Sequence, residues 1–523
     1  MLHRNAKTKF ILSKLSREIC VSFSIRQGDP LAMLLYIIYV EPLLIYIEKR
    51  AAGLRLFSPP GSSSDVVQCT EGYCDDLNVI TDQDSDLLLV DQAVRKFELV
   101  SGAILSRNQK CKIMGFGKWN KRINWPLKYV QSVQEVKVFG VFLMNSYAQT
   151  LKRNWDYRYK KFEQTIFSWS SRVLVSLRQR VQVINVYALS RIYYIASILP
   201  LSKTAGKKFE RIMGKFIWRS SGRILRVSLE ELKLPCLRGG LKLACVHKMS
   251  NSLLLTQLLR LLKNGDFKSL RSVDFWIGEV LSDIFPNLDQ QLHAVNTPSY
   301  FQILAGLIAD AQISDLLTST NWENITNKVV YDHEIGNLPA PKVELDLGIP
   351  FSLAWKRLCY ASLPSEDRDT VFLLIHRKLP VKERLFRINM EVDPYCTTCF
   401  DVDGDAVICD LEHFFCTCGN VLPMWNSVKE IIFDLLQVHV SNQDILSFLF
   451  PSSSFEAEIM WLLGSYVGLI WTWHYVKGDT ISSAQLFGFL KFKYRKSQLG
   501  SRVTFGPRML DNLTRQELLS VSN

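Results

Sequence analysis

Two adjacent carboxylates, Asp75 and Asp76, lie between short runs of residues that favour β-strands. The runs are residues 66–70 and 77–80, and together they predict a β-hairpin with both aspartates at its tip. Adjacent carboxylates repel each other, so such a pair is typical of a site that holds a cation. Mg²⁺ is the usual one, bound by one or two carboxylates together with substrate phosphate oxygens. An isolated Asp-Asp pair is also typical of a plain polar turn, so its surroundings must decide.

A second group of residues has the spacing of metal ligands. Three cysteines and one histidine follow the pattern C-x₂-C-x₁₃-H-x₄-C, at Cys396, Cys399, His413 and Cys418. Three thiolates and one imidazole form a closed tetrahedral zinc site, which is structural and not hydrolytic. Cys409 and Cys416 lie in the same stretch, and either could replace a ligand. The alternative is a chance cluster of free thiols.

Four motifs resemble, in their order, those of the reverse transcriptases of LINE-type, non-LTR retrotransposons. They are the template-gripping box RQGDPL at 26–31, the Tyr-x-Asp-Asp box at 73–76, the motif SGAILSRNQK at 101–110, and the primer-grip strand VFGVFL at 138–143. Residues 412–415, EHFF, resemble the Glu-His-Leu-Phe of the zinc-binding region near the C-terminus of many such enzymes. Each motif alone is weak, but the four in order are specific.

The resemblance implies an RNA-directed DNA polymerase, a nucleotidyltransferase in which Asp75 and Asp76 hold Mg²⁺. It further implies that residues of the first two boxes position the template and the incoming nucleotide, namely Arg26, Gln27, Gly28 and Tyr73. Lys110 occupies roughly the place of a lysine that can protonate the pyrophosphate leaving group, although Lys112 fits equally well. The alternative is that either lysine only contacts phosphate.

One element of that chemistry is missing from residues 1–28. Two-metal phosphoryl transfer uses carboxylates from two strands, yet this segment contains no Asp and only one acidic residue, Glu18. The first catalytic strand, the fingers and an endonuclease domain are absent too, so the chain resembles the C-terminal part of the element's protein. We expect it not to polymerise by itself, unless a longer reading frame supplies the missing acid.

Charge is distributed unevenly along the chain. The net charge is +13, but residues 107–260 contain 30 Lys and Arg against 6 Asp and Glu, a local +24, so the rest carries −11. This is the footprint of a nucleic-acid-binding surface, or else a solvated basic face. A second basic stretch, residues 491–502, could contact RNA or form a solvated tail.

Helical periodicity places the cations of this basic segment on one side of a helix. Apolar residues recur at 209, 212, 213, 216 and 217, while Lys208, Arg211 and Lys215 share another side. We expect the apolar face to pack and the basic face to grip the phosphates of a template–primer duplex without reading its sequence.

Other elements must position the aspartate hairpin. A helix is predicted from Pro30, with Leu34 and Ile38 at helical spacing. Asp82, Asp84 and Asp86 alternate as in a calcium-binding loop, but the required glycine and closing acid are Leu87 and Ala93, which excludes an EF-hand. They are interpreted as charges at the start of a helix that ends at Gly102.

Composition indicates a globular protein of a reducing compartment. Of the 12 cysteines, five fall between Cys396 and Cys418, which favours a metal site over disulfides. No signal peptide is visible, and the apolar stretch 459–476 favours a buried helix over a membrane span. We therefore expect an intracellular protein, cytoplasmic or nuclear, with no membrane partner. We expect His376 to be a core or surface residue and not a catalytic one. The pair Gly239–Gly240 predicts a turn.

The sequence thus predicts an α+β protein in five regions. These are a partial right-hand palm (1–145), a basic helical thumb (146–260), a helical connector (261–345), a zinc-binding region (346–425) and a helical C-terminal region (426–523). The expected partners are an RNA template and a DNA primer or target. The alternative function, a zinc-containing RNA- or DNA-binding protein without catalysis, needs only the basic segment and the cysteine cluster. The sequence does not show which RNA or target site is bound.

Overall fold

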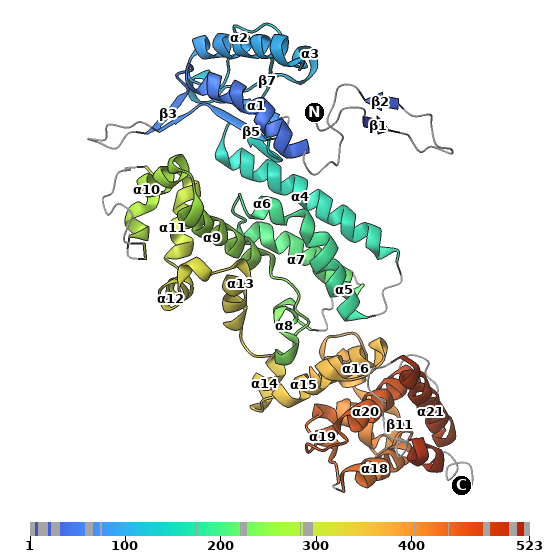
Figure 1. The fold of residues 1–523 in the computed structure, drawn as a ribbon. Helices are drawn as coiled ribbons and strands as arrows, with labels where there is room; N and C mark the ends of the chain where they lie inside the picture. The colour runs from blue at the N-terminus through green and yellow to red at the C-terminus, as the bar shows by residue number, and fades with distance from the viewer. Residues whose placement is uncertain are drawn as a thin grey trace. The chain divides into compact units, whose positions relative to one another are not determined.

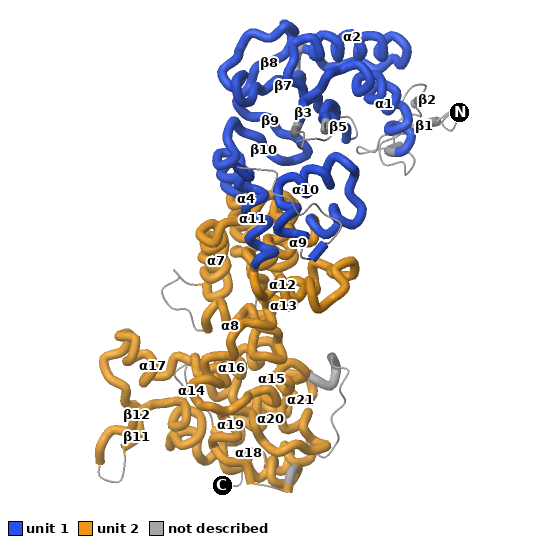
Figure 2. Tube along the Cα trace, turned by 90° about the vertical axis from the view of Figure 1, so that its left-hand side faces the viewer, with its two compact units in different colours: residues 1–156, 258–309 blue, residues 157–257, 310–523 orange. Residues whose placement is uncertain are grey.

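The computed structural model describes residues 6–8, 19–21, 32–57, 66–73, 76–172, 176–219, 227–282, 284–285, 296–400, 404–437, 439–473, 482–500 and 510–516 (Figure 1). The chain forms two compact units, residues 1–156 with 258–309 and residues 157–257 with 310–523 (Figure 2). Two of the three unit boundaries lie within helices, α4 (Tyr147–Ser170) and α9 (Val246–Asn264), and the third lies between Ala309 and Asp310. The five regions predicted from the sequence divide the chain more finely and stay a prediction.

Unit 1 combines small two-stranded sheets with helices. Its helices are α1 (Ala32–Glu48), α2 (Asp84–Ser101), α3 (Arg107–Lys110), α10 (Phe267–Leu281) and α11 (Ser299–Ile308). The strand pairs are β1 (Ala6–Thr8) with β2 (Ile19–Val21), β3 (Leu54–Phe57) with β4 (Val66–Gln68), β5 (Thr70–Tyr73) with β6 (Asp76–Val79), β7 (Lys112–Ile113) with β8 (Gln131–Ser132), and β9 (Glu135–Val138) with β10 (Val141–Met144). Among the strand pairs in the described part of unit 1, β7 and β8 form the parallel one. Among the described residues every sheet has two strands, and the polymerase palm stays a prediction.

The core of unit 1 forms between α1 and α2. The helix predicted after Pro30 is confirmed as α1, but Leu34 and Ile38 are exposed, and the second half of the helix carries the packing. The buried cluster contains two residues of α1, two of α2 and one between β4 and β5: Leu43, Ile47, Ala93, Val94 and Cys69. α2 also confirms its predicted ends, since its first turn carries Asp84 and Asp86 and Gly102 caps it with φ 73°.

Unit 2 is mostly helical. Its helices include α5 (Leu177–Val183), α6 (Tyr193–Ala196), α7 (Lys203–Trp218), α8 (Leu229–Lys233), α12 (Ala311–Ser319), α13 (Asn327–Gly336), α14 (Lys342–Leu347), α15 (Ser352–Tyr360), α16 (Ser365–Ile375), α17 (Lys382–Arg387), α18 (Leu422–Leu436), α19 (Asn442–Ser447), α20 (Glu456–Ile470) and α21 (Ser483–Gly500). One antiparallel hairpin, β11 (Tyr395–Phe400) with β12 (Ala406–Ile408), precedes α18.

The Gly239–Gly240 turn is a packing junction. It follows the 3₁₀ turn η4 (Cys236–Arg238), and Gly239 adopts φ 81°. A Cβ on Gly239 would lie 2.7 Å from the Trp355 ring, and one on Gly240 would lie 1.9 Å from the Leu234 carbonyl oxygen. Both positions therefore require glycine. His376 closes the junction from α16, with its ring 4.8 Å from Trp355 and Nε2 2.8 Å from the Gly239 carbonyl oxygen. His376 is thus a core histidine, and burial lowers its pKa to about 4.

The apolar stretch near the C-terminus forms α20, where every residue from Ile459 to Ile470 is buried. The prediction of a buried helix is confirmed. No helix in the described part of the chain is long and apolar enough to cross a membrane.

Candidate functional site

The acidic hairpin consists of β5 and β6. These strands are antiparallel, and their register pairs Tyr73 with Asp76, so Cys74 and Asp75 lie between the strands in sequence. Cys74 and Asp75 themselves lie outside the described residues. Tyr73 and Asp76 are both exposed, as a carboxylate that meets a cation and a substrate phosphate must be.

The upstream arm of this hairpin differs from the predicted one. Residues 66–68 form β4, which pairs with β3, and the arm that faces β6 is Thr70–Tyr73. The prediction of residues 66–70 as the arm was therefore wrong, because β-propensity alone does not tell two consecutive short strands apart.

A second hairpin contacts the first at Tyr73. β9 and β10 are joined through Phe139 and Gly140, which have φ values of 47° and 82°, as in a tight hairpin turn. The Phe139 ring lies edge-on to the Tyr73 ring, with centroids 6.0 Å apart. The Tyr-x-Asp-Asp box and the strand that resembles the primer grip therefore meet within unit 1.

The base of the acidic hairpin is held by Asp86. Its carboxylate accepts hydrogen bonds from the backbone N–H of Ala52 (3.0 Å) and Gly53 (2.9 Å) and from the Thr81 hydroxyl (2.7 Å). It thereby ties the loop after β6 to the loop before β3. Asp84, two residues earlier in α2, pairs instead with Arg122 at 2.7 Å near the surface.

The remaining residues predicted around the hairpin stay unassigned. Arg26, Gln27 and Gly28 lie outside the described residues. Lys110 ends the short helix α3 and Lys112 opens β7, and both side chains are exposed. Geometry therefore does not choose between the two lysines.

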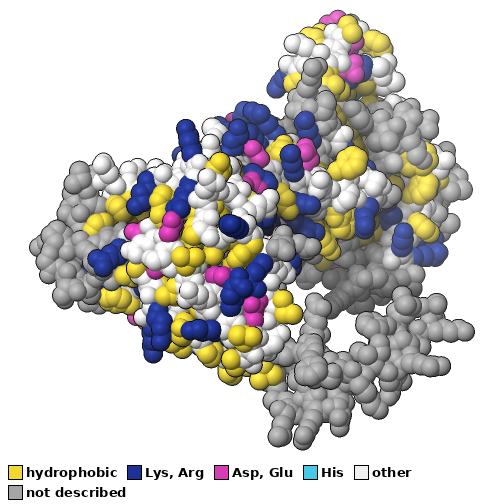
Figure 3. All heavy atoms as spheres, turned by 90° about the horizontal axis from the view of Figure 1, so that it is seen from above, with side chains coloured by type: hydrophobic (Ala, Val, Ile, Leu, Met, Phe, Trp, Pro, Cys, Tyr) yellow, Lys and Arg dark blue, Asp and Glu magenta, His cyan; other side chains and the backbone are white. Residues whose placement is uncertain are grey.

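The predicted amphipathic helix is confirmed as α7. Phe209, Met213 and Ile217 are buried, and the Phe209 ring packs against Phe162 with centroids 5.2 Å apart. The cations of the opposite face are exposed: Lys207, Lys208, Arg211 and Lys215. On the face of the molecule in Figure 3, Lys and Arg side chains lie dispersed among acidic and uncharged ones. α7 is thus a packed helix that offers a row of cations.

The four predicted zinc ligands come together. The ligand atoms of Cys396, Cys399, His413 and Cys418 all lie within 4.8 Å of one another. The sulfurs of Cys399 and Cys418 are 3.7 Å apart, close to the edge of about 3.8 Å expected for two thiolates on one zinc ion. His413 Nε2 is buried without a hydrogen-bond partner, as a nitrogen reserved for a metal would be. The donor set therefore fits zinc. Cys409 and Cys416 are not part of this group.

Neighbouring groups hold the ligands in place. The backbone N–H of Gly419 donates to Cys399 Sγ at 3.3 Å, and the Thr417 hydroxyl lies 3.4 Å from His413 Nδ1. Such outer contacts orient metal ligands. They come from residues that the sequence reasoning missed, because a threonine or glycine near a ligand carries no signal of its own.

Charge within the group favours a cation. Burial raises the pKa of the Cys396 thiol, but hydrogen bonds from Thr398 and nearby backbone N–H groups lower it to about 6. Burial and the neighbouring Cys396 and Cys399 sulfurs raise the pKa of Cys418 to about 12. A divalent cation between the sulfurs would favour all three thiolates.

The local fold delivers the ligands from two elements. Cys396 and Cys399 lie on β11, while His413 opens the single π-helical turn η6 (His413–Thr417) and Cys418 follows it. The two phenylalanines after His413 are buried, and the rings of Phe414 and Phe415 lie 5.8 and 6.4 Å from Trp471. These aromatic contacts anchor the candidate metal centre in the helical core.

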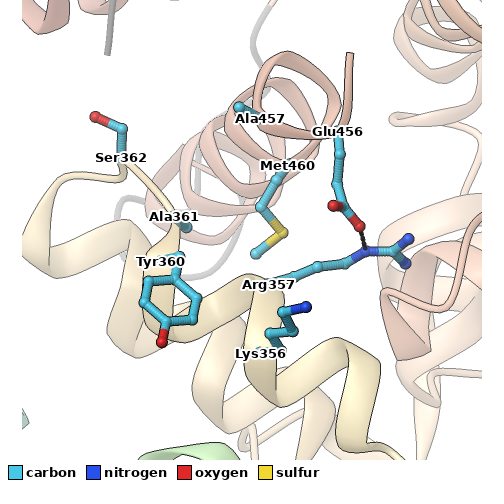
Figure 4. Close-up of a pocket in the computed structure, with 8 residues that line it drawn as sticks. All are labelled: Lys356, Arg357, Tyr360, Ala361, Ser362, Glu456, Ala457 and Met460. Carbon is cyan, nitrogen blue, oxygen red and sulfur yellow. Dashed lines mark hydrogen bonds and ion pairs between the residues drawn. The ribbon is translucent and has the colours of Figure 1, made fainter. Parts of the chain in front are cut away.

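A pocket of about 140 Å³ lies elsewhere in unit 2, between α15 and α20 (Figure 4). In it Arg357 Nε donates to Glu456 Oε1 at 2.5 Å, and the Arg357 guanidinium lies over Phe450 at 3.8 Å from the ring centre. None of the residues predicted as ligands or catalytic groups lines this pocket. The buried Arg357 is explained as a structural contact between the two helices.

Comparison with known proteins gives a limited similarity. No family model matches the chain. Over 253 residues, or 47% of its length, the chain is 24% identical to the transposon TX1 uncharacterized 149 kDa protein of Xenopus laevis. The match spans 18% of that protein's length. The similarity supports an origin in a transposable element and leaves the activity open.

Proposed function

We propose that the chain is the C-terminal part of an RNA-directed DNA polymerase of a non-LTR retrotransposon. The observation that carries this proposal is the register of β5 and β6, which pairs Tyr73 with Asp76 across an exposed hairpin. The similarity to a transposon protein supports the same origin.

In this proposal each region has a separate task. Asp75 and Asp76 are carboxylates on one side of a two-metal site, whose other carboxylate must come from another strand. A magnesium ion there would supply electrostatic stabilisation of the transferred phosphoryl group. The exposed cations of α7 contact template–primer phosphates, and the Cys₃His centre braces the surrounding surface.

The hairpin can be tested with iron in place of magnesium. The 523-residue chain is incubated with a template–primer duplex, Fe²⁺ and ascorbate, so that radicals formed at a bound ion cut the adjacent backbone. Cleavage is expected next to residues 73–79 and should disappear in the Asp75→Ala/Asp76→Ala variant. Wild-type cleavage that is absent there, or that survives the double substitution, would overturn the proposal.

A nucleotide-extension assay with Mg²⁺ adds a second measurement. The chain alone should not extend a primer, because residues 1–28 supply no aspartate to complete the site. Robust extension would mean that the required carboxylate comes from somewhere within these 523 residues.

The exposed basic face of α7 and the Cys₃His group favour a second candidate function, a zinc-containing RNA- or DNA-binding protein without catalysis. Under this alternative, duplex binding persists and weakens steeply with salt, while the iron-dependent cleavage at the hairpin is absent.

A further inference from the structure

Two cysteines outside the Cys₃His centre lie against each other in unit 2. Cys236 belongs to the turn η4 and Cys359 to α15, and both side chains line one small pocket. Both are half-buried, in contrast to the buried Cys245 and Cys416. In the described part of the chain, the Cys₃His centre is the one group of three or more possible metal ligands, so this pair lacks the further ligands of a metal site.

The pair lines a small pocket with basic surroundings. Arg178, from α5, donates to Cys236 Sγ over 3.7 Å. Arg368 and Asp369, from α16, line the same pocket, and Asp369 accepts a hydrogen bond from the backbone N–H of Leu177 at 2.6 Å. The pocket has a volume of about 20 Å³. This volume suits one molecule about the size of water.

We infer that Cys236 and Cys359 are an oxidation site, at which a small peroxide converts the two thiols into an intramolecular disulfide. The bond would join η4, in the basic helical region, to α15, in the zinc-containing region. This inference is independent of the proposed polymerase function.

The two thiols have different roles in this reaction. The hydrogen bond from Cys359 lowers the pKa of Cys236 to about 6, with Arg178 and Lys242 adding to the effect against burial. The same hydrogen bond and burial raise the pKa of Cys359. Because the Arg178 guanidinium donates to Cys236 Sγ over 3.7 Å, Cys236 is assigned as the thiolate and Cys359 as the thiol that resolves it.

The step balances in atoms and electrons. The Cys236 thiolate attacks one peroxide oxygen, the O–O bond breaks, and a sulfenic acid and hydroxide form. Cys359 then attacks the sulfenic sulfur, the S–O bond breaks and the S–S bond forms. Protons from the medium and from Cys359 convert the two departing oxygens to two waters. The sulfurs lose two electrons and the peroxide gains them.

The test is peptide mapping of the full zinc-loaded chain after treatment with dilute hydrogen peroxide. Free thiols are alkylated, and the chain is digested with trypsin without reduction. The sequence supplies separate tryptic peptides for the two cysteines, residues 234–238 and 358–368. We expect these peptides to be joined, two hydrogens lighter than their sum, and to separate on reduction. If both cysteines remain alkylatable, or if Cys236 is joined to a different cysteine, the inference is wrong.

Variants separate the two roles. In Cys359→Ser the sulfenic acid on Cys236 should persist and react with dimedone, whereas in Cys236→Ser no sulfenic acid should form on Cys359. Arg178→Gln should slow disulfide formation about 3- to 10-fold near neutral pH, because a smaller fraction of Cys236 is ionised. Cys111→Ser, which changes another half-buried cysteine, is the matched control and should leave the rate unchanged. An unreactive Cys236 in Cys359→Ser would contradict the assignment of the attacking sulfur.

Discussion

The Cys₃His centre and the acidic hairpin differ in how much of the chain each needs. All four ligands of the centre lie between Cys396 and Cys418, on one hairpin and the turn that follows. The hairpin offers carboxylates at Asp75 and Asp76, and two-metal chemistry requires a further acid from another strand. A closed local site can thus be judged from its own residues, whereas an open site depends on distant ones.

The largest effect of a single substitution is expected at the Cys₃His centre. Cys418→Ser, or a strong chelator, should remove zinc and unfold the segment around residues 395–420, because structural zinc contributes about 10–16 kcal/mol to the folding of small zinc domains. Zinc per chain, measured by mass spectrometry, should fall from one to near zero, and trypsin should cut the segment.

The matched control is Cys409→Ser, a buried cysteine in the same stretch that is not part of the group. This variant should retain its zinc. Loss of zinc in Cys409→Ser with retention in Cys418→Ser would show that Cys409 is the ligand.

The spacing of the cysteines predicted the four gathered residues, but it could not exclude Cys409 or Cys416. That exclusion depends on where the fold places Cys409, just after β12, and Cys416, within η6, and spacing does not encode this. The Gly239–Gly240 turn was similarly predictable from the sequence. The reason that Gly239 must be glycine was not, because the Trp355 ring that packs against it comes from a helix more than a hundred residues later.

The acidic hairpin and α7 also show that sequence patterns predict local structure but not tertiary contacts. The helical period correctly predicted both faces of α7, because the period is a local property. The β-formers at 66–70 predicted a hairpin arm, but residues 66–68 pair with β3, and this pairing depends on tertiary contacts. Asp84 and Asp86 looked alike in the sequence, and only the fold gives Asp86 three hydrogen-bond donors.

The next largest effect is expected on the free energy of unfolding, when Asp86 and Asp84 are replaced in turn. Asp86→Ala should lower the free energy of unfolding of unit 1 by about 3 kcal/mol, because it leaves buried backbone N–H groups without an acceptor. Asp84→Ala removes a partly exposed ion pair with Arg122 and should cost less than about 1 kcal/mol. Urea denaturation followed by fluorescence measures both. Equal losses would contradict the role of Asp86 in holding the hairpin base.

The basic face of α7 should contribute less, and only to binding. Lys208→Gln/Arg211→Gln/Lys215→Gln should weaken duplex binding about 10- to 100-fold and reduce the salt slope by about 2.7, if each cation contacts one phosphate. Fluorescence anisotropy across a salt series measures both quantities. The control is Lys328→Gln/Lys356→Gln/Arg377→Gln, three exposed cations outside α7, which changes the net charge equally. Equal weakening by both triples would mean that only net charge matters.

The smallest effect is expected where the acidic hairpin contacts the second hairpin. Trp471 packs against the Cys₃His centre, and the question is whether Phe139 packs against the acidic hairpin in the same way. Tyr73 and Phe139 meet edge-on, but Tyr73 is 66% exposed, so the pair should couple by only about 0.5–1 kcal/mol. A double-mutant cycle of Tyr73→Ala and Phe139→Ala measures this coupling, and Tyr73→Phe should preserve it because the ring remains. A coupling of zero would mean that the two hairpins move independently. The strand that resembles the primer grip would then not be positioned by the hairpin that carries Tyr73, and the carboxylates of the proposed site would depend on substrate to bring them into place.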